Sequence, residues 1–147
     1  MSKLILFICT GNTCRSPMAE AIFNKLAQDT DYYAASAGLY SAGGQAASQE
    51  AIDAVAQLGC DLSEHRSGPL RYEQLLEAEK IICLTDNHKA FLLSAYPELN
   101  EKTLSFSELT GKSVEDPFGG NAELYQRSAD AIAEGVKRLL QGLQGLS

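Results

Sequence analysis

The chain has 147 residues, the length of one typical domain, and its hydrophobic share of 45% and charged share of 21% are those of a globular protein. This composition excludes a disordered or fibrous chain. The net charge of -7 argues against nucleic acid as the main partner, because phosphate backbones bind to basic surfaces. The longest apolar run, residues 4–9, is too short to cross a membrane, and no small-residue cleavage site follows it. We expect a soluble, cytoplasmic protein in which residues 1–147 form a single domain.

The first predicted elements are a strand and a helix joined by a short loop. Residues 4–8 form a continuous apolar run, which is typical of a strand buried on both faces of a parallel sheet. The turn-rich residues 10–13 follow this strand. Ser16 and Pro17 then predict an N-cap and the first position of a helix, whose apolar stripe continues to Leu26.

The same alternation of strand and helix patterns recurs to the end of the chain. An apolar stripe closed by Gly59 and a longer stripe that ends at Leu143 are both typical of helices. Further strands are predicted at residues 32–35, 80–84 and 103–106, and helices at 51–58, 72–78, 87–95 and 124–143. Strands that alternate with helices imply an α/β fold, with a four-stranded parallel sheet and helices on both faces.

The edge of such a sheet predicts where the functional site lies. Parallel sheets place their ligands beyond the carboxyl ends of the strands. In the predicted fold, that edge carries residues 9–15, 36–38 and 85–86. Candidate functional residues are therefore expected in these three segments.

Four cysteines, Cys9, Cys14, Cys60 and Cys83, limit the possible chemistry. Two disulfides would suit an exported protein, but the chain is large and apolar for a disulfide scaffold. The cysteine spacings match no zinc-ligand pattern and only two histidines are present, so we expect no metal and no cofactor. The thiols are then either small buried residues or nucleophiles, and Cys60 and Cys83 fit the first description.

The loop between the first strand and the first helix starts at Cys9 and ends at Arg15, with five residues between them. Free N–H groups in such a loop, together with the helix N-terminus, form an anion site. Gly11 lets the backbone approach the anion closely, and the planar fork of Arg15 holds two oxygens of a tetrahedral oxyanion. The same field favours the thiolate of Cys9, which is its nucleophilic form. The spacing alone also fits a buried cysteine and a solvated arginine, but its place between an apolar strand and Ser-Pro favours the anion site.

The sequence of this loop resembles a known family. The run Cys-Thr-Gly-Asn-Thr-Cys-Arg-Ser-Pro-Met-Ala-Glu at residues 9–20 closely resembles the signature of low-molecular-weight protein tyrosine phosphatases. The resemblance continues at residues 36–38, 62–67 and 116–120, in the family's order and spacing, and so covers nearly the whole chain. It implies a four-stranded parallel sheet flanked by helices and a cysteine-dependent protein phosphatase that uses no metal.

The resemblance also implies the catalytic roles. Cys9 would attack phosphorus to give a phosphocysteine intermediate, and Arg15 would hold the equatorial oxygens that gain charge. Asp116 matches the family's general acid, which protonates the leaving group and then activates water. Taken alone, an aspartate before Pro117 is also typical of the start of a turn.

Other residues match the family's support for the loop. Asn12, Ser16, Ser36 and His65 would form hydrogen bonds that hold the loop and the thiolate. Cys14 matches a neighbouring cysteine that can form a reversible disulfide with the nucleophile, although a small packed residue is an equal alternative. The residues expected at the substrate site are Thr10, Gly11, Asn12, Thr13, Cys14, Ser16, Tyr40 and Phe118.

Thr13 bears on the substrate. The family's tyrosine phosphatases usually carry a branched aliphatic residue there, and threonine resembles the bacterial protein-arginine phosphatase branch. A hydroxyl at the pocket wall suits a polar guanidinium, whereas an aliphatic side chain suits an aromatic ring. Phe118 suits either substrate, and Tyr40 would form the facing wall. The sequence favours phosphoarginine and leaves phosphotyrosine open.

Two further functions are less favoured. Arsenate reductases on this fold need additional cysteines near the end of the third strand, where this chain has only Cys83 inside the strand. A non-catalytic phosphate-binding module would be expected to lack Cys9, Arg15 or Asp116, and all three are present. The expected partner is a phosphorylated protein, with no nucleic acid and no membrane, and the expected state is a monomer or weak dimer.

Overall fold

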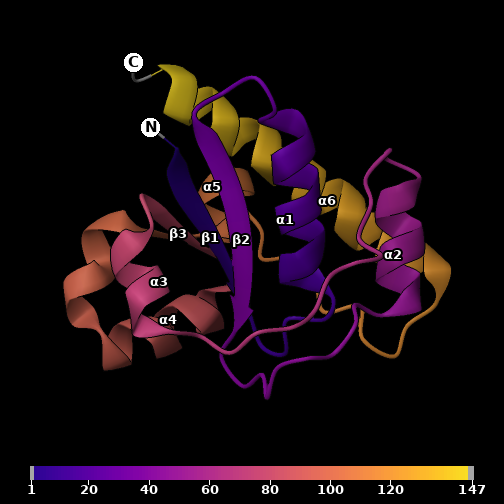
Figure 1. Ribbon diagram of the computed structural model, residues 1–147, viewed down its shortest axis with the longest axis horizontal. Helices are drawn as coiled ribbons and strands as arrows, with labels where there is room; N and C mark the ends of the chain where they lie inside the picture. Colours follow the sequence, from indigo (N-terminus) through magenta and orange to yellow (C-terminus); the bar gives the residue numbers. More distant parts are fainter. Residues whose placement is uncertain (1, 146–147) are drawn as a thin grey trace.

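Four parallel strands form the centre of the computed structural model, which describes residues 2–145. Along the chain they are β1 (Lys3–Cys9), β2 (Tyr32–Gly38), β3 (Lys80–Cys83) and β4 (Thr103–Ser105). They lie in the order β2-β1-β3-β4, and every neighbouring pair is parallel. The predicted four-stranded parallel sheet is confirmed (Figure 1).

The central position of β1 explains its continuous apolar run. Its side chains alternate between the two faces of the sheet, so that Ile5 and Phe7 lie in one core and Leu6 and Ile8 lie in the other. The register pairs Cys9 with Gly38 of β2. The loop that leaves β1 therefore begins between two neighbouring strands, at the carboxyl edge predicted for the site.

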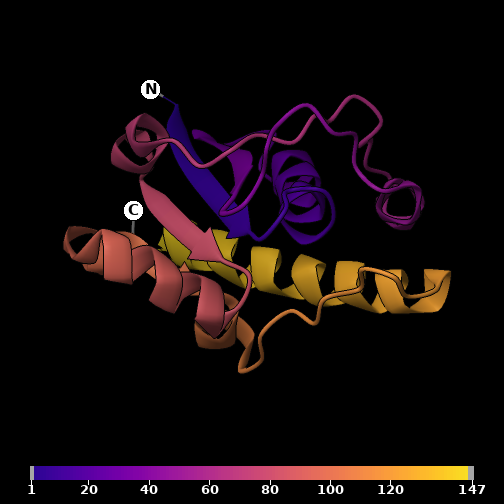
Figure 2. The same ribbon diagram turned by 90° about the horizontal axis from the view of Figure 1, so that it is seen from below.

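Helices cover both faces of this sheet (Figures 1 and 2). One core contains buried residues of helices α1 (Arg15–Leu26), α2 (Gln49–Ala56), α5 (Phe106–Thr110) and α6 (Ala122–Gly145). The other contains buried residues of α3 (Tyr72–Glu77), α4 (Asp86–Ala95) and the 3-10 helix η1 (Pro97–Lys102). Figure 2 shows α6 running along the length of the molecule. Within the described part of the chain, none of the helices has the length and apolar character needed to span a membrane.

Two local predictions were wrong in detail. Helix α1 begins at Arg15, with Cys14 in the N-cap position, so Ser16 lies inside the first turn and is not the cap. The Ser16 hydroxyl instead contacts two residues of the loop, at Cys9 Sγ and Asn12 Nδ2. At the other end of the chain, Phe106 begins α5 and does not belong to the fourth strand.

Candidate active site

The loop after β1 encloses a cavity of about 240 Å³ at the carboxyl edge of the sheet. Gly38 makes this geometry possible, because a Cβ there would lie 2.8 Å from the carbonyl oxygen of Thr10 and 3.0 Å from the Gly11 carbonyl carbon. At Gly11 itself, a Cβ would meet nothing nearer than Thr13 Oγ1 at 3.8 Å. The cavity is lined by Cys9, Thr10, Gly11, Thr13, Cys14, Arg15, Asp116 and Phe118.

Backbone donors of the loop are free. Within residues 2–145, no acceptor takes a hydrogen bond from the N–H groups of Gly11, Asn12, Thr13 or Cys14. The first N–H groups of α1, which begins at Arg15, also lack partners within the helix. Unpartnered amides next to a helix N-terminus attract anions through their partial positive charges. This part of the loop can therefore bind an oxyanion.

Asn12 fixes the shape of the loop from within. Its backbone has φ of +60°, a left-handed conformation that asparagine tolerates better than most residues, and its side chain is fully buried. Its Nδ2 donates to Ser16 Oγ and to Ser36 Oγ, both at 2.9 Å, and its Oδ1 accepts from Gly68 N at 2.9 Å. Its carbonyl oxygen lies 2.9 Å from His65 Nε2. All the polar groups of this side chain are used to hold neighbouring segments together.

Cys9 is buried, and its sulfur lies 2.9 Å from Ser16 Oγ. Because Ser16 Oγ accepts a hydrogen bond from Asn12 Nδ2, its own proton is free to point at the sulfur. A hydroxyl that donates to sulfur stabilises the thiolate over the thiol. The hydroxyl of Ser16 is thus placed to donate a hydrogen bond to the sulfur of Cys9.

Glu20, which was not predicted as a site residue, ends the same chain of hydrogen bonds. Ser36 Oγ accepts from Asn12 and donates to Glu20 Oε1 at 2.5 Å. Burial raises the pKa of Glu20, while the hydrogen bond from Ser36 acts to lower it. The chain Glu20–Ser36–Asn12–Ser16 therefore runs from a half-buried carboxyl group to the sulfur of Cys9.

Arg15 and Asp116 lie together at the mouth of the cavity. The guanidinium is buried, with Nη1 donating to the carbonyl oxygen of Val114 at 3.1 Å. Its Nη2 lies 3.7 Å from Asp116 Oδ2, whose side chain is 57% exposed. Asp116 Oδ1 accepts from the backbone N–H of Phe118 at 3.0 Å. A fixed cation and a solvent-accessible carboxyl group thus lie side by side.

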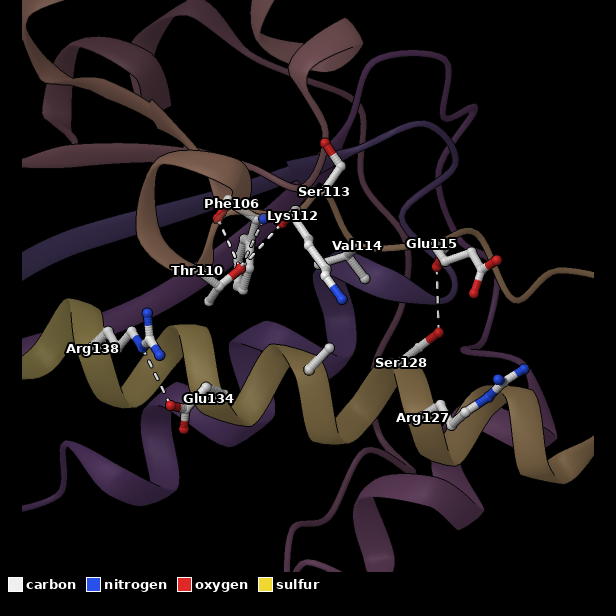
Figure 3. Close-up of a pocket in the computed structure, with 11 residues that line it drawn as sticks. Phe106, Thr110, Lys112, Ser113, Val114, Glu115, Arg127, Ser128, Glu134 and Arg138 are labelled. Carbon is white, nitrogen blue, oxygen red and sulfur yellow. Dashed lines mark hydrogen bonds and ion pairs between the residues drawn. The ribbon is translucent and has the colours of Figure 1, made fainter.

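The segment before Asp116 is fixed at both sides. The N–H of Val114 donates to the carbonyl of Leu84 at 2.9 Å, which ties the segment to the end of β3. Ser128 Oγ on α6 donates to the carbonyl of Glu115 at 3.3 Å (Figure 3). A second cavity, of about 370 Å³, lies between this segment, α5 and α6, and its lining contains neither cysteine nor histidine. The hydrogen bonds of Val114 and Glu115 hold Asp116 close to Arg15.

The remaining predicted residues divide into three groups. Thr10, Gly11, Thr13, Cys14 and Phe118 line the cavity, whereas Asn12 and Ser16 are buried and Ser36 and His65 contact Asn12. Tyr40 is not among the lining residues: the residue is 68% exposed, and the centre of its ring lies 5.4 Å from that of Phe91.

The sulfur of Cys14 has neighbours of its own. It lies 3.4 Å from Tyr125 Oη and 3.6 Å from Ser48 Oγ. Burial, followed by the hydrogen bond with Cys14, raises the pKa of Tyr125 to about 12. Tyr125 therefore keeps its proton at neutral pH, and these contacts attach the loop to α6 and to the start of α2.

His88 is a second residue at the site that sequence reasoning missed. Its Nε2 lies 2.9 Å from Thr10 Oγ1, and its side chain is buried. Burial, together with the charge of Arg15, lowers the pKa of His88 to about 4, so the ring is neutral at neutral pH. The one available signal was its position just after the predicted edge residues 85–86.

Comparisons with known proteins agree with this geometry. A family model described as low molecular weight phosphotyrosine protein phosphatase matches residues 4–146. A protein-arginine-phosphatase of Geobacillus stearothermophilus is 36% identical over 148 residues, which cover 98% of this chain and 98% of the relative. A crystal structure of a low molecular weight protein tyrosine phosphatase from T. tengcongensis is 39% identical with a TM-score of 0.91, and covers 96% of this chain and 99% of that one. A YwlE arginine phosphatase, solved as a cysteine-to-serine mutant with a phosphorylated active site serine, is 33% identical with a TM-score of 0.89, and covers 96% and 95% respectively.

Proposed function

Because the chain belongs to the low molecular weight phosphotyrosine protein phosphatase family and is a cysteine-dependent protein phosphatase, we propose that it removes phosphate from phosphorylated arginine side chains of proteins. The observation that carries this proposal is Thr13 in the lining of the cavity. Its hydroxyl can accept a hydrogen bond from a guanidinium, which the ring of phosphotyrosine cannot donate. The likeness to a protein-arginine-phosphatase over almost the whole chain supports the same choice.

In the proposed first step, Cys9 attacks phosphorus as a thiolate. An S–P bond forms while the P–N bond to the substrate guanidinium breaks, and Asp116 gives its proton to the departing nitrogen. The 2.9 Å contact of the sulfur with Ser16 Oγ supports the thiolate. The exposed carboxyl of Asp116 at the mouth of the cavity suits a group that must reach the leaving atom.

Charge on the transferring phosphoryl group is the main obstacle to this step. The three equatorial oxygens would be held by the free N–H groups between Gly11 and Cys14 and by the guanidinium of Arg15. Arg15 is positioned by its bond to Val114 and is buried, so its orientation is set before substrate arrives. Donors fixed in advance stabilise the transition state without reorganising during the reaction.

The second proposed step releases phosphate. Asp116, now a carboxylate, takes a proton from water as the water oxygen attacks phosphorus. The S–P bond breaks, inorganic phosphate is released, and the Cys9 thiolate is regenerated. The relative whose mutant carries a phosphorylated active site serine supports a covalent phosphoenzyme. No redox change and no co-reactant other than water is needed.

Phosphotyrosine is the competing substrate. The T. tengcongensis protein with 39% identity is named a protein tyrosine phosphatase, and the flat, 77% exposed side chain of Phe118 would also suit an aromatic ring. Phosphate release from matched phosphoarginine and phosphotyrosine peptides, with Cys9→Ser as blank, separates the two. We expect a higher kcat/KM for phosphoarginine, and a fall of that preference by roughly tenfold in Thr13→Ile, on the scale of one lost hydrogen bond. A preference for phosphotyrosine would overturn the substrate proposal and leave the chemistry standing.

The setting of the enzyme is part of the proposal. All four cysteines are free in the described structure, which supports work in a reducing cytoplasm. We propose a monomer or weak dimer that acts on phosphorylated proteins. Sedimentation velocity at micromolar concentration should give a mass near 15.8 kDa, and a stable larger species would contradict this.

A disulfide between Cys9 and Cys14 also stays a prediction. Both residues line the same cavity. Peroxide treatment followed by peptide mass spectrometry should find the pair linked and activity restored by dithiothreitol. Irreversible oxidation of Cys9 with Cys14 left reduced would contradict a protective bridge.

A further inference from the structure

His88 contacts the catalytic loop from a distant part of the chain. It lies in the first turn of α4, where its backbone N–H donates to the N-cap hydroxyl of Thr85 at 3.1 Å. From there its Nε2 reaches Thr10 Oγ1 at 2.9 Å, across a separation of 78 residues. The contact joins a well-anchored helix start to the residue that follows the nucleophile.

The ring of His88 has a single hydrogen-bond partner among the described residues. Its Nδ1 is buried and has none. A neutral ring carries one N–H, and buried N–H groups without an acceptor are rarer than acceptors without a donor. The proton is therefore assigned to Nε2, which donates to Thr10 Oγ1. Burying Nδ1 without a partner is unfavourable, so a benefit elsewhere on the ring is expected. The bond between Nε2 and Thr10 is the one hydrogen bond of the ring, in the described part of the chain, that can supply it.

Thr10 is held at two points. Its carbonyl oxygen accepts from the N–H of Tyr40 at 2.9 Å, and its hydroxyl oxygen accepts from His88. Thr10 lines the cavity between Cys9 and the free amides that begin at Gly11. A shift of Thr10 would thus move both the nucleophile and the first donor of the oxyanion site.

We propose that His88 is a positioning residue of this phosphatase, which fixes Thr10, and with it the start of the phosphate-binding loop, by donating its Nε2–H to the threonine hydroxyl. The inference rests on the proposed function of the loop. The hydroxyl proton of Thr10, which the bond from His88 leaves free, can then point toward the cavity that Thr10 lines. A shift of Thr10 should weaken the stabilisation of the transition state more than the binding of substrate, because the loop donors must match the transition state.

A double-mutant cycle tests the proposal. His88→Phe keeps a planar ring without nitrogen, and Thr10→Val keeps the shape of threonine without its hydroxyl. We expect each variant to lower kcat by roughly tenfold with KM within about twofold, on the scale of one hydrogen bond. The double variant should be no slower than the slower single variant. The proposal would be overturned if the two single losses in kcat multiplied in the double variant, or if the variants changed only KM.

A conservative variant supplies the matched control. The side-chain amide of His88→Gln can reach the position of Nε2 and donate to Thr10, so it should recover most of the kcat that His88→Phe loses. A glutamine variant as slow as the phenylalanine variant would show that the ring acts by packing alone, and would overturn the proposal.

An NMR measurement keeps the test independent of activity and of the folding of His88→Phe. Long-range ¹H–¹⁵N spectra of the unsubstituted chain should show His88 neutral with its proton on Nε2, and Thr10→Val should shift that nitrogen. An Nδ1–H ring, or an unchanged Nε2 signal in Thr10→Val, would overturn the proposal. If unsubstituted protein shows these signals but releases no phosphate, the function is wrong and the contact between His88 and Thr10 stands.

Discussion

Ser16 Oγ lies 2.9 Å from Cys9 Sγ and, at the same time, accepts a hydrogen bond from Asn12 Nδ2. Asn12 Nδ2 can only donate, so this second bond uses a lone pair of Ser16 Oγ and leaves the hydroxyl proton available to the sulfur. A residue that looks in sequence like a helix cap instead contacts the sulfur of Cys9.

Ser16→Ala should therefore slow the chemistry of Cys9. Loss of a donor to a buried thiolate is expected to reduce alkylation by iodoacetamide at neutral pH by roughly tenfold, since hydrogen bonds to charged groups contribute about 1.5–3 kcal/mol. The measurement is the second-order alkylation rate, with the exposed Ser63→Ala as the matched control. Equal rates in the two variants would show that Ser16 does not donate to the sulfur.

Asp116→Asn should separate substrates by their leaving groups. An asparagine cannot deliver a proton, so turnover of substrates with basic leaving groups should fall by about 10²–10⁴-fold, while an activated aryl phosphate should lose much less. Steady-state kcat on a series of aryl phosphates with graded leaving-group pKa values tests this. The expected slope against leaving-group pKa is steeper in the variant than in the unsubstituted enzyme. Parallel slopes would contradict an acid role for Asp116.

His88 should make the fold less stable in acid. Its folded pKa of about 4 lies below the ordinary value of 6.5, so the unfolded chain binds more protons between these two pH values. The stability that the neutral ring contributes is full above pH 6.5 and is lost as the pH falls toward 4. Glu20, whose pKa burial raises, acts in the opposite direction.

Urea unfolding at pH 7 and pH 4.5 measures this effect. The loss of unfolding free energy between the two pH values should be smaller in His88→Phe than in the unsubstituted chain, because the variant lacks the titrating ring. Comparing the two chains cancels the contributions of Glu20 and the other titrating groups, which both chains share. The two chains should then approach each other in stability at the lower pH. An identical loss in both would contradict the lowered pKa of His88.

The parts of the fold that the sequence predicts are those encoded by neighbouring residues. The apolar run of β1 and the stripe of α1 are local patterns, and the loop between them, from Cys9 to Arg15, carries its chemistry within one short segment. The short helices η1 and α5 were missed because one or two turns give too few residues for a periodic pattern.

Contacts between distant segments could not be predicted in the same way. Thr10 and His88 are 78 residues apart, and only the pairing of β1 with β3 brings the helix after β3 next to the loop after β1. Glu20 was not predicted as a site residue, because its bond to Ser36 depends on how β2 lies beside α1. Ser16 was assigned to the cap because Ser-Pro commonly starts helices, and the competing bond to Cys9 has no local signal.

The most direct test of the central claim is to look for phosphate on Cys9. Asp116→Asn, which should slow hydrolysis of the intermediate, is mixed with a phosphoarginine peptide, quenched within milliseconds and analysed by peptide mass spectrometry. We expect phosphate bound through sulfur on the peptide that contains Cys9, at a level that decays at the rate of turnover. The double variant Cys9→Ser/Asp116→Asn has no sulfur at this position and should carry phosphate, if any, only on the serine oxygen. Steady release of phosphate with no phosphocysteine at any quench time would contradict nucleophilic catalysis by Cys9.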